Sequence, residues 1–174
     1  EFIGSKANLT PEEYTNFISS GEKVKDVYQA CRKIDEELAG LRNKETQCHN
    51  LLSGLDPWKN LSLPLEEIKN TKRLRMQLQA IPANELQSLQ EALAEKAYEH
   101  YLEIVSADRD LAYTFFIYFE EEAAQVQDLL KKAGATEVRF PDLRGTVAQN
   151  MEKLNHEIRE IDRQRESLKQ KVKD

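Results

Sequence analysis

Glycine and proline are scarce in this sequence, with six glycines and five prolines among 174 residues. A disordered tail would contain more of both, and a β-sandwich would need them in its turns. Charged residues make up 32% of the chain. This combination indicates long helices that bury one stripe and expose their other faces to solvent.

Cysteine is also rare, and only Cys31 and Cys48 are present. Both fall in one helical pattern, so at about 1.5 Å per residue they lie roughly 25 Å apart. A disulfide needs a Cα separation of about 4.4–6.8 Å. We expect two free thiols, buried as small apolar side chains on the helix, as suits the cytosol.

No apolar run is long enough to span a membrane. The longest is LAYTFFIYF at residues 111–119, whereas a membrane-spanning helix needs roughly 20 residues. No basic segment followed by an apolar one opens the chain as a signal peptide would. We expect a soluble chain, and the initial Glu-Phe without Met suggests a piece of a longer protein.

Catalytic and metal-binding motifs are missing. His49, His100 and His156 lack metal-ligand spacing. There is no phosphate loop, GxGxxG sequence or nucleophile elbow. The acidic run Glu120–Glu122 is typical of a helix start. We therefore expect no catalytic residue, no cofactor and no metal site.

What the chain does contain is two heptad seams, in which apolar residues recur at alternating spacings of three and four. The first seam is Val24, Val27, Cys31, Ile34, Leu38, Leu41, Glu45, Cys48, Leu52 and Leu55; the second is Val147, Met151, Leu154, Ile158, Ile161, Arg165, Leu168 and Val172. Each seam is too narrow to be stable alone. The economical partner is the other seam, in an antiparallel coiled coil; the alternative is that each helix pairs with another chain.

Capping signals bound these helices. Thr10, Pro11 and Glu13 form a capping-box start, and Thr146 with Gln149 forms a second. Pro57 ends the first long helix. We predict an outgoing helix over residues 11–56, a linker over 57–72, an α/β lobe over 73–142, and a return helix over 143–174.

The segment between the helices alternates strand and helix patterns. Strands are predicted at 73–80, 98–105, 111–119 and 137–140, with helices at 84–96 and 120–133. The order β-α-β-β-α-β predicts a ferredoxin-like sheet with strand order 4-1-3-2 and a central third strand. The fold class is therefore α+β, with this lobe inserted at the tip of a long antiparallel two-helix coiled coil.

The third strand has two apolar faces that must be assigned. We expect one face to pack under the helices: Tyr113, Phe115, Ile117 and Phe119. The other face would then be open and would combine residues of two strands: Thr114, Phe116 and Tyr118 beside Arg73, Arg75, Gln77 and Gln79.

RNA-recognition domains share this element order and stack bases on aromatic residues of the third strand. Residues 73–140, however, carry seven Lys/Arg against twelve Asp/Glu, and the first strand has no aromatic residue. The net negative charge of this segment repels phosphate groups, so we expect no nucleic-acid partner. A small-molecule sensor with this fold is an alternative, as is a generic coiled-coil interaction module.

The order of features resembles the cytoplasmic part of subunit I, the large stator subunit of V/A-type ATPases (subunit a in eukaryotes). The matching features are a long heptad helix ending in Leu55-Asp56-Pro57-Trp58, an Arg/Gln-rich strand ending in Pro82, an Asp108–Asp110 hairpin, a helix ending in Ala133-Gly134, and Phe140-Pro141 before Gly145-Thr146 and the return helix. The chain corresponds to the distal lobe and part of the coil of that family.

The resemblance implies a mechanical role at the cytoplasmic face of a membrane-bound, proton- or sodium-translocating complex. The distal lobe would grip the peripheral stalk, a heterodimer of E and G subunits, and connect it through a proximal lobe and membrane helices to the ion-path subunit. Our candidate docking residues are Arg73, Arg75, Gln77, Gln79, Phe116, Tyr118 and Trp58. Trp58 has a second interpretation as a plug that seals the junction between helix and lobe.

Overall fold

The computed structural model describes residues 10–171, except for the side chains of residues 13–19. The chain divides into two compact units. The first, which we call the arm, contains the described residues up to Thr46 together with those from Arg159 onward; the second, the lobe unit, contains residues 47–158. Each is described by itself.

Two long helices supply the arm and also extend into the lobe unit. Helix α1 runs without a break from Pro11 to Leu55, and α4 runs from Val147 to Lys171. The end of α1 at Leu55 agrees with the stop expected from Pro57, which lies in a following 3₁₀ turn. The expected capping box at the start of α1 stays a prediction, since the Glu13 side chain lies outside the described part.

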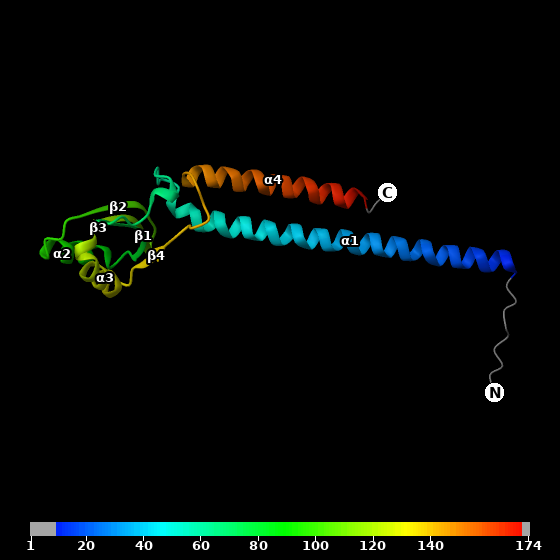
Figure 1. Cartoon of the computed structure of the whole chain (residues 1–174), viewed down its shortest axis with the longest axis horizontal. Helices are drawn as coiled ribbons and strands as arrows, with labels where there is room; N and C mark the ends of the chain where they lie inside the picture. Colours follow the sequence, from blue (N-terminus) through cyan, green and yellow to red (C-terminus); the bar gives the residue numbers. More distant parts are fainter. Residues whose placement is uncertain (1–9, 172–174) are drawn as a thin grey trace, which may run out of the picture. The chain divides into compact units, whose positions relative to one another are not determined.

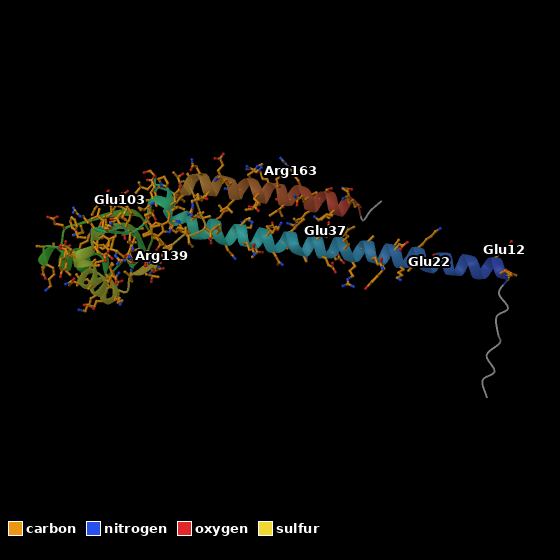
Figure 2. The ribbon with its side chains drawn as sticks, viewed as in Figure 1. Glu12, Glu22, Glu37, Glu103, Arg139 and Arg163 are labelled. Carbon is orange, nitrogen blue, oxygen red and sulfur yellow. The ribbon has the colours of Figure 1, made fainter. Side chains whose placement is uncertain are left out.

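In the arm, α4 runs beside α1 (Figure 1). Leu41, Ile161 and Leu168 are buried there. Glu45 pairs with Arg165, whereas Glu37 and Leu41, earlier in α1, line a groove with Leu168 and Lys171, later in α4. The helices are therefore antiparallel, as predicted. Charged residues such as Arg163 lie at the outside of the pair (Figure 2).

The first part of the predicted seam has no described partner helix. Val24, Val27 and Tyr28 are exposed, and so is Cys31. The expected burial of Cys31 is therefore wrong, whereas Cys48, in the lobe unit, is buried as predicted. The physical reason is length, because α4 has 25 described residues against 45 in α1.

A charged pair interrupts the apolar seam of the arm. Glu45 and Arg165 occupy seam positions of α1 and α4, and Arg165 Nη1 donates a hydrogen bond of 2.8 Å to Glu45 Oε2. Their side chains are only 25% and 26% exposed. Opposite charges that meet inside an apolar seam favour the one alignment that pairs them.

We expect Glu45→Ala and Arg165→Ala to be non-additive in a double-mutant cycle. Arg165→Ala leaves the half-buried Glu45 without this cation, whereas Glu45→Ala leaves Arg165 only its longer contact of 3.5 Å with the more exposed Asp162. The coupling energy should therefore be about 1 kcal/mol. Thermal unfolding followed by circular dichroism measures it. The control is Glu160 with Arg163, a pair at 2.6 Å with side chains 41% and 73% exposed, whose coupling should stay below about 0.5 kcal/mol. Equal coupling in both pairs contradicts the prediction.

The lobe unit contains a four-stranded antiparallel sheet in the order β2-β3-β1-β4. The strands are β1 (Leu74–Pro82), β2 (His100–Ala107), β3 (Leu111–Phe119) and β4 (Thr136–Val138). Helix α2 (Leu86–Glu95) follows β1, and α3 (Ala123–Lys132) follows β3 after a 3₁₀ turn over Glu120–Glu122. The predicted element order, α+β class and central third strand are confirmed.

The predicted faces of β3 are reversed in the structure. Phe116 and Tyr118 pack against α2 and α3, in one core with Leu93 and Val126. Phe115 packs on the opposite face of the sheet with Leu78. The cause lies outside the strand, because a second set of apolar residues covers the face that was expected to be open.

That second cover comes from the linker and the adjoining ends of the long helices within the lobe unit. Its buried residues are Leu55, Trp58, Leu61, Leu65 and Val147. The sheet is therefore a middle layer with an apolar core on each side. The linker contains the short 3₁₀ turn Leu65–Glu67 and is fixed by a hydrogen bond of 3.0 Å from the Leu65 amide to the Gly145 carbonyl.

The start of α4 is capped as predicted. The Thr146 amide donates to Gln149 Oε1 (2.9 Å), and the Gln149 amide donates to Thr146 Oγ1 (3.2 Å). Gly145 before them has φ of +80°, a conformation that favours glycine. Its amide donates to Glu66 Oε2 (2.7 Å), and hydrogen bonds from the Glu66 and Gly145 backbone amides hold the pKa of that carboxyl below its usual value.

Candidate docking surface

The described part of the chain contains no cluster of three or more His, Cys, Asp or Glu side chains that could hold a metal ion. Among its helices, none combines the length and apolar character required to cross a bilayer. Seven residues are predicted from the sequence to form a docking surface: Trp58, Arg73, Arg75, Gln77, Gln79, Phe116 and Tyr118.

Four of these seven residues are buried inside the lobe. Phe116 and Tyr118 are 0% and 1% exposed, and Gln77 and Gln79 are each 4% exposed. Their predicted location on an open face is wrong, because α2 and α3 cover that side of the sheet. In the described conformation these side chains form no part of the surface that a partner could contact.

The two glutamines are held in the core by hydrogen bonds that meet at the side-chain oxygen of Gln77. Gln79 Nε2 donates to Gln77 Oε1 (3.0 Å), and the Tyr118 hydroxyl donates to the same oxygen (3.1 Å). Thr114 Oγ1 donates to the Gln79 carbonyl (3.3 Å). Burial raises the pKa of Tyr118. A satisfied buried network of this kind is structural.

Trp58 is buried as well, at 1% exposure. Its ring meets Tyr113 edge to face, with centroids 5.5 Å apart. It lies in the core formed by the linker, which is the location expected of a plug between the end of α1 and the sheet.

Arg73 is exposed and Arg75 is half-buried at the start of β1. Arg75 forms a bidentate ion pair with Glu120, in which Arg75 Nη2 donates a hydrogen bond of 2.7 Å to Glu120 Oε1. The hydrogen bond from Arg75 lowers the pKa of Glu120. The pair contributes its full stabilisation when the pH is above the pKa that glutamate has in the unfolded chain. This contribution is lost as the pH falls through the lower pKa of Glu120 in the folded chain.

The apolar surface that is accessible lies at one end of the sheet. Leu74, Tyr101, Ile117 and Phe119 form what we call the end patch. Leu74 pairs with Phe119 and Tyr101 with Ile117 in the strand register, and paired residues share a face. Tyr101 is 53% and Phe119 39% exposed. The four residues line a hollow of about 220 Å³ with Glu99, His100 and Tyr118.

Acidic residues surround the end patch. Glu103 is exposed in β2 (Figure 2) and accepts a hydrogen bond of 2.9 Å from the Tyr101 hydroxyl. An adjoining hollow of about 490 Å³ is lined by Phe119 with two basic and four acidic residues: Lys72, Arg73, Glu99, Glu120, Glu121 and Glu122. The rim therefore has an excess of negative charge.

Sequence reasoning missed this surface for an identifiable reason. Phe119 was assigned to the helix-covered face, and no exposure was predicted for Tyr101. The linker core covers Phe115 and Val105 on the same face of the sheet, but its buried cover does not include Tyr101 or Phe119. The alternation of residues in the strands does not show how much of this face the linker covers.

Comparison of the sequence with models of known protein families and with curated proteins gives no match. Among solved structures, the chain is similar to the crystal structure of the cytoplasmic N-terminal domain of subunit I, homolog of subunit a, of V-ATPase. The TM-score is 0.55, the identity is 16%, and the match covers 97% of this chain and 55% of the other. The resemblance inferred from the sequence is confirmed at the level of fold.

Proposed function

We propose that this chain is part of a V-type ATPase stator, in which the lobe docks the peripheral stalk and the helices connect it to the membrane ion-path subunit. The observation that carries the proposal is the shared fold, since the match includes 97% of this chain. The match spans 55% of that cytoplasmic domain, and in this proposal the proximal lobe and the membrane helices are further parts of a longer protein.

The internal construction of the arm supports a mechanical role. Two antiparallel helices with buried Leu41, Ile161 and Leu168 resist bending more than one helix does, because bending the pair must shear a packed seam. The charged pair Glu45–Arg165 adds a fixed alignment to that seam. In this role the chain transmits force between two partners and performs no catalysis itself.

We expect the purified 174-residue chain to form a complex with the purified E/G stalk heterodimer in size-exclusion chromatography and isothermal titration calorimetry. A net charge of −6 makes salt dependence of the association informative, since charge-steered association weakens as ionic strength rises. Absence of a complex at micromolar concentrations of both proteins contradicts the proposal.

A thermal-shift screen separates this role from that of a small-molecule sensor. A ligand that binds only the folded state raises its stability by about 2.7 kcal/mol at 100 times its Kd. For a stator part we expect no stabilisation by amino acids or by single-stranded RNA. A reproducible increase in the melting temperature with an amino acid favours the sensor instead.

A further inference from the structure

The end patch differs from the rest of the sheet in its cover. On the helix side, Phe116 and Tyr118 are buried beneath Leu89, Leu93 and Val126. On the linker side, Phe115 is 3% exposed. Four residues further along β3 on that linker face, Phe119 is 39% exposed and Tyr101 across the sheet is 53% exposed. The patch is thus the uncovered end of a face whose central residues Leu78, Val105 and Phe115 are buried.

The shape of the patch fits a helix. Its residues come from three adjacent strands, β1, β3 and β2, and two interstrand spacings of about 4.8 Å amount to roughly 10 Å. An α-helix with its side chains is about 10–12 Å wide. The same sheet already packs helices on its other face, through the apolar stripes of α2 and α3.

The edge of β2 fits an added strand less well. A register shift between Ile104 and Ser106 interrupts the strand. Asn60 Nδ2 from the linker donates to the Val105 carbonyl at 3.4 Å, and Ser106 Oγ donates to the Pro57 carbonyl at 2.5 Å. Linker contacts and irregular pairing therefore affect the second half of this edge, and bulges of this kind discourage strand addition.

The charge around the patch defines the chemistry of the partner. Glu99, Glu103 and Glu121 are exposed at or beside it and outnumber the exposed Lys72 and Arg73, and Glu120 is already paired with Arg75. A partner with acidic residues at its margins would be repelled, whereas lysine or arginine flanking an apolar stripe would be attracted.

We infer that the end patch docks one amphipathic helix of a partner protein, with apolar residues on Leu74, Tyr101, Ile117 and Phe119 and with basic residues opposite the glutamates. This inference rests on the proposed role of the lobe as a docking unit. It locates that docking on the linker-side face of the sheet, at the end where β2 begins and β3 finishes.

The test uses the isotope-labelled 174-residue chain and two designed helical peptides of about 18 residues, or five turns. Both carry leucine at i, i+3, i+4 and i+7, and they differ only in having lysine or glutamate beside that stripe. The lysine peptide should shift the NMR signals of the four patch residues, and the glutamate peptide should not. Equal effects of both peptides, shifts confined to the outer edge of β2, or shifts that appear on concentration without peptide would each overturn the inference.

Matched variants make the test specific. Tyr101→Lys with Phe119→Lys should weaken binding of the lysine peptide by about tenfold or more, as loss of central interface residues does. Ile104→Lys is the control, because Ile104 is 47% exposed in the same strand but pairs with Thr114 on the other face; it should leave binding unchanged. Circular dichroism checks that each variant is folded, and Phe119→Ser serves if the double variant is not.

The same variants separate this inference from the proposed function. If the chain binds the E/G stalk and the Tyr101→Lys, Phe119→Lys variant binds it equally well, the inference is wrong and the proposed function stands. If the stalk does not bind but the lysine peptide shifts the patch, the proposed function fails and the docking chemistry stands.

Discussion

Phe116→Ala should destabilise the lobe by about 3–5 kcal/mol, the usual cost of removing a buried aromatic ring. Phe116 is completely buried in the core beneath α2 and α3. Its ring centroid lies 5.1 Å from that of Tyr118 and 5.8 Å from that of His100. Truncation therefore leaves a cavity in a region where neighbouring rings lose packing partners.

The natural control is Phe119→Ala, three residues along the same strand. Phe119 is 39% exposed, so its truncation should cost less than about 1 kcal/mol. Urea unfolding followed by the fluorescence of Trp58, the only tryptophan in the chain, measures both within the lobe unit. The opposite ranking of the two variants would restore the face assignment that we expected from the sequence.

Trp58→Ala should be similarly costly, about 3–5 kcal/mol, although Trp58 belongs to no helix or strand longer than a single turn. It is 1% exposed and contacts Tyr113 edge to face. Its removal opens the core that joins the end of α1, the linker and the sheet. The loss should appear in urea unfolding followed by circular dichroism, since the variant lacks the fluorophore.

Trp58→Phe tests the plug interpretation more finely. It keeps an aromatic ring against Tyr113 while removing part of the volume, so the cost should fall to about 1–2 kcal/mol. If Trp58→Ala were as stable as the parent chain, Trp58 would not act as a plug.

The order of elements could be predicted because each has a local signal. Pro57 ends α1, the Thr146–Gln149 box begins α4, and the alternation in residues 111–119 defines β3. These signals depend on residues close in sequence, and right-handed crossovers then restrict the strand order to few possibilities.

The facing of β3 could not be predicted in the same way. Adjacent Phe115 and Phe116 put an aromatic ring on each side of the sheet, and both are buried. Alternation shows that the sides differ but not which side the helices take. Gln77 and Gln79 added to the error, because glutamine is common on surfaces, yet these two are buried and joined by a hydrogen bond in the core. The exposed patch was missed for the same reason, since its limits depend on how far the linker cover extends.

The Glu45–Arg165 pair has a consequence for a helix pair under tension. Two helices pulled in opposite directions can slip past each other one heptad at a time, about 10.5 Å per step, because each step again places apolar seam residues against apolar seam residues. Each such step separates the half-buried Glu45 from Arg165 and leaves Glu45 among apolar seam residues, while Arg165 keeps only its contact of 3.5 Å with Asp162 on its own helix. The pair therefore contributes little to the stability of the aligned helices, but it opposes the sliding of one helix along the other from the first step.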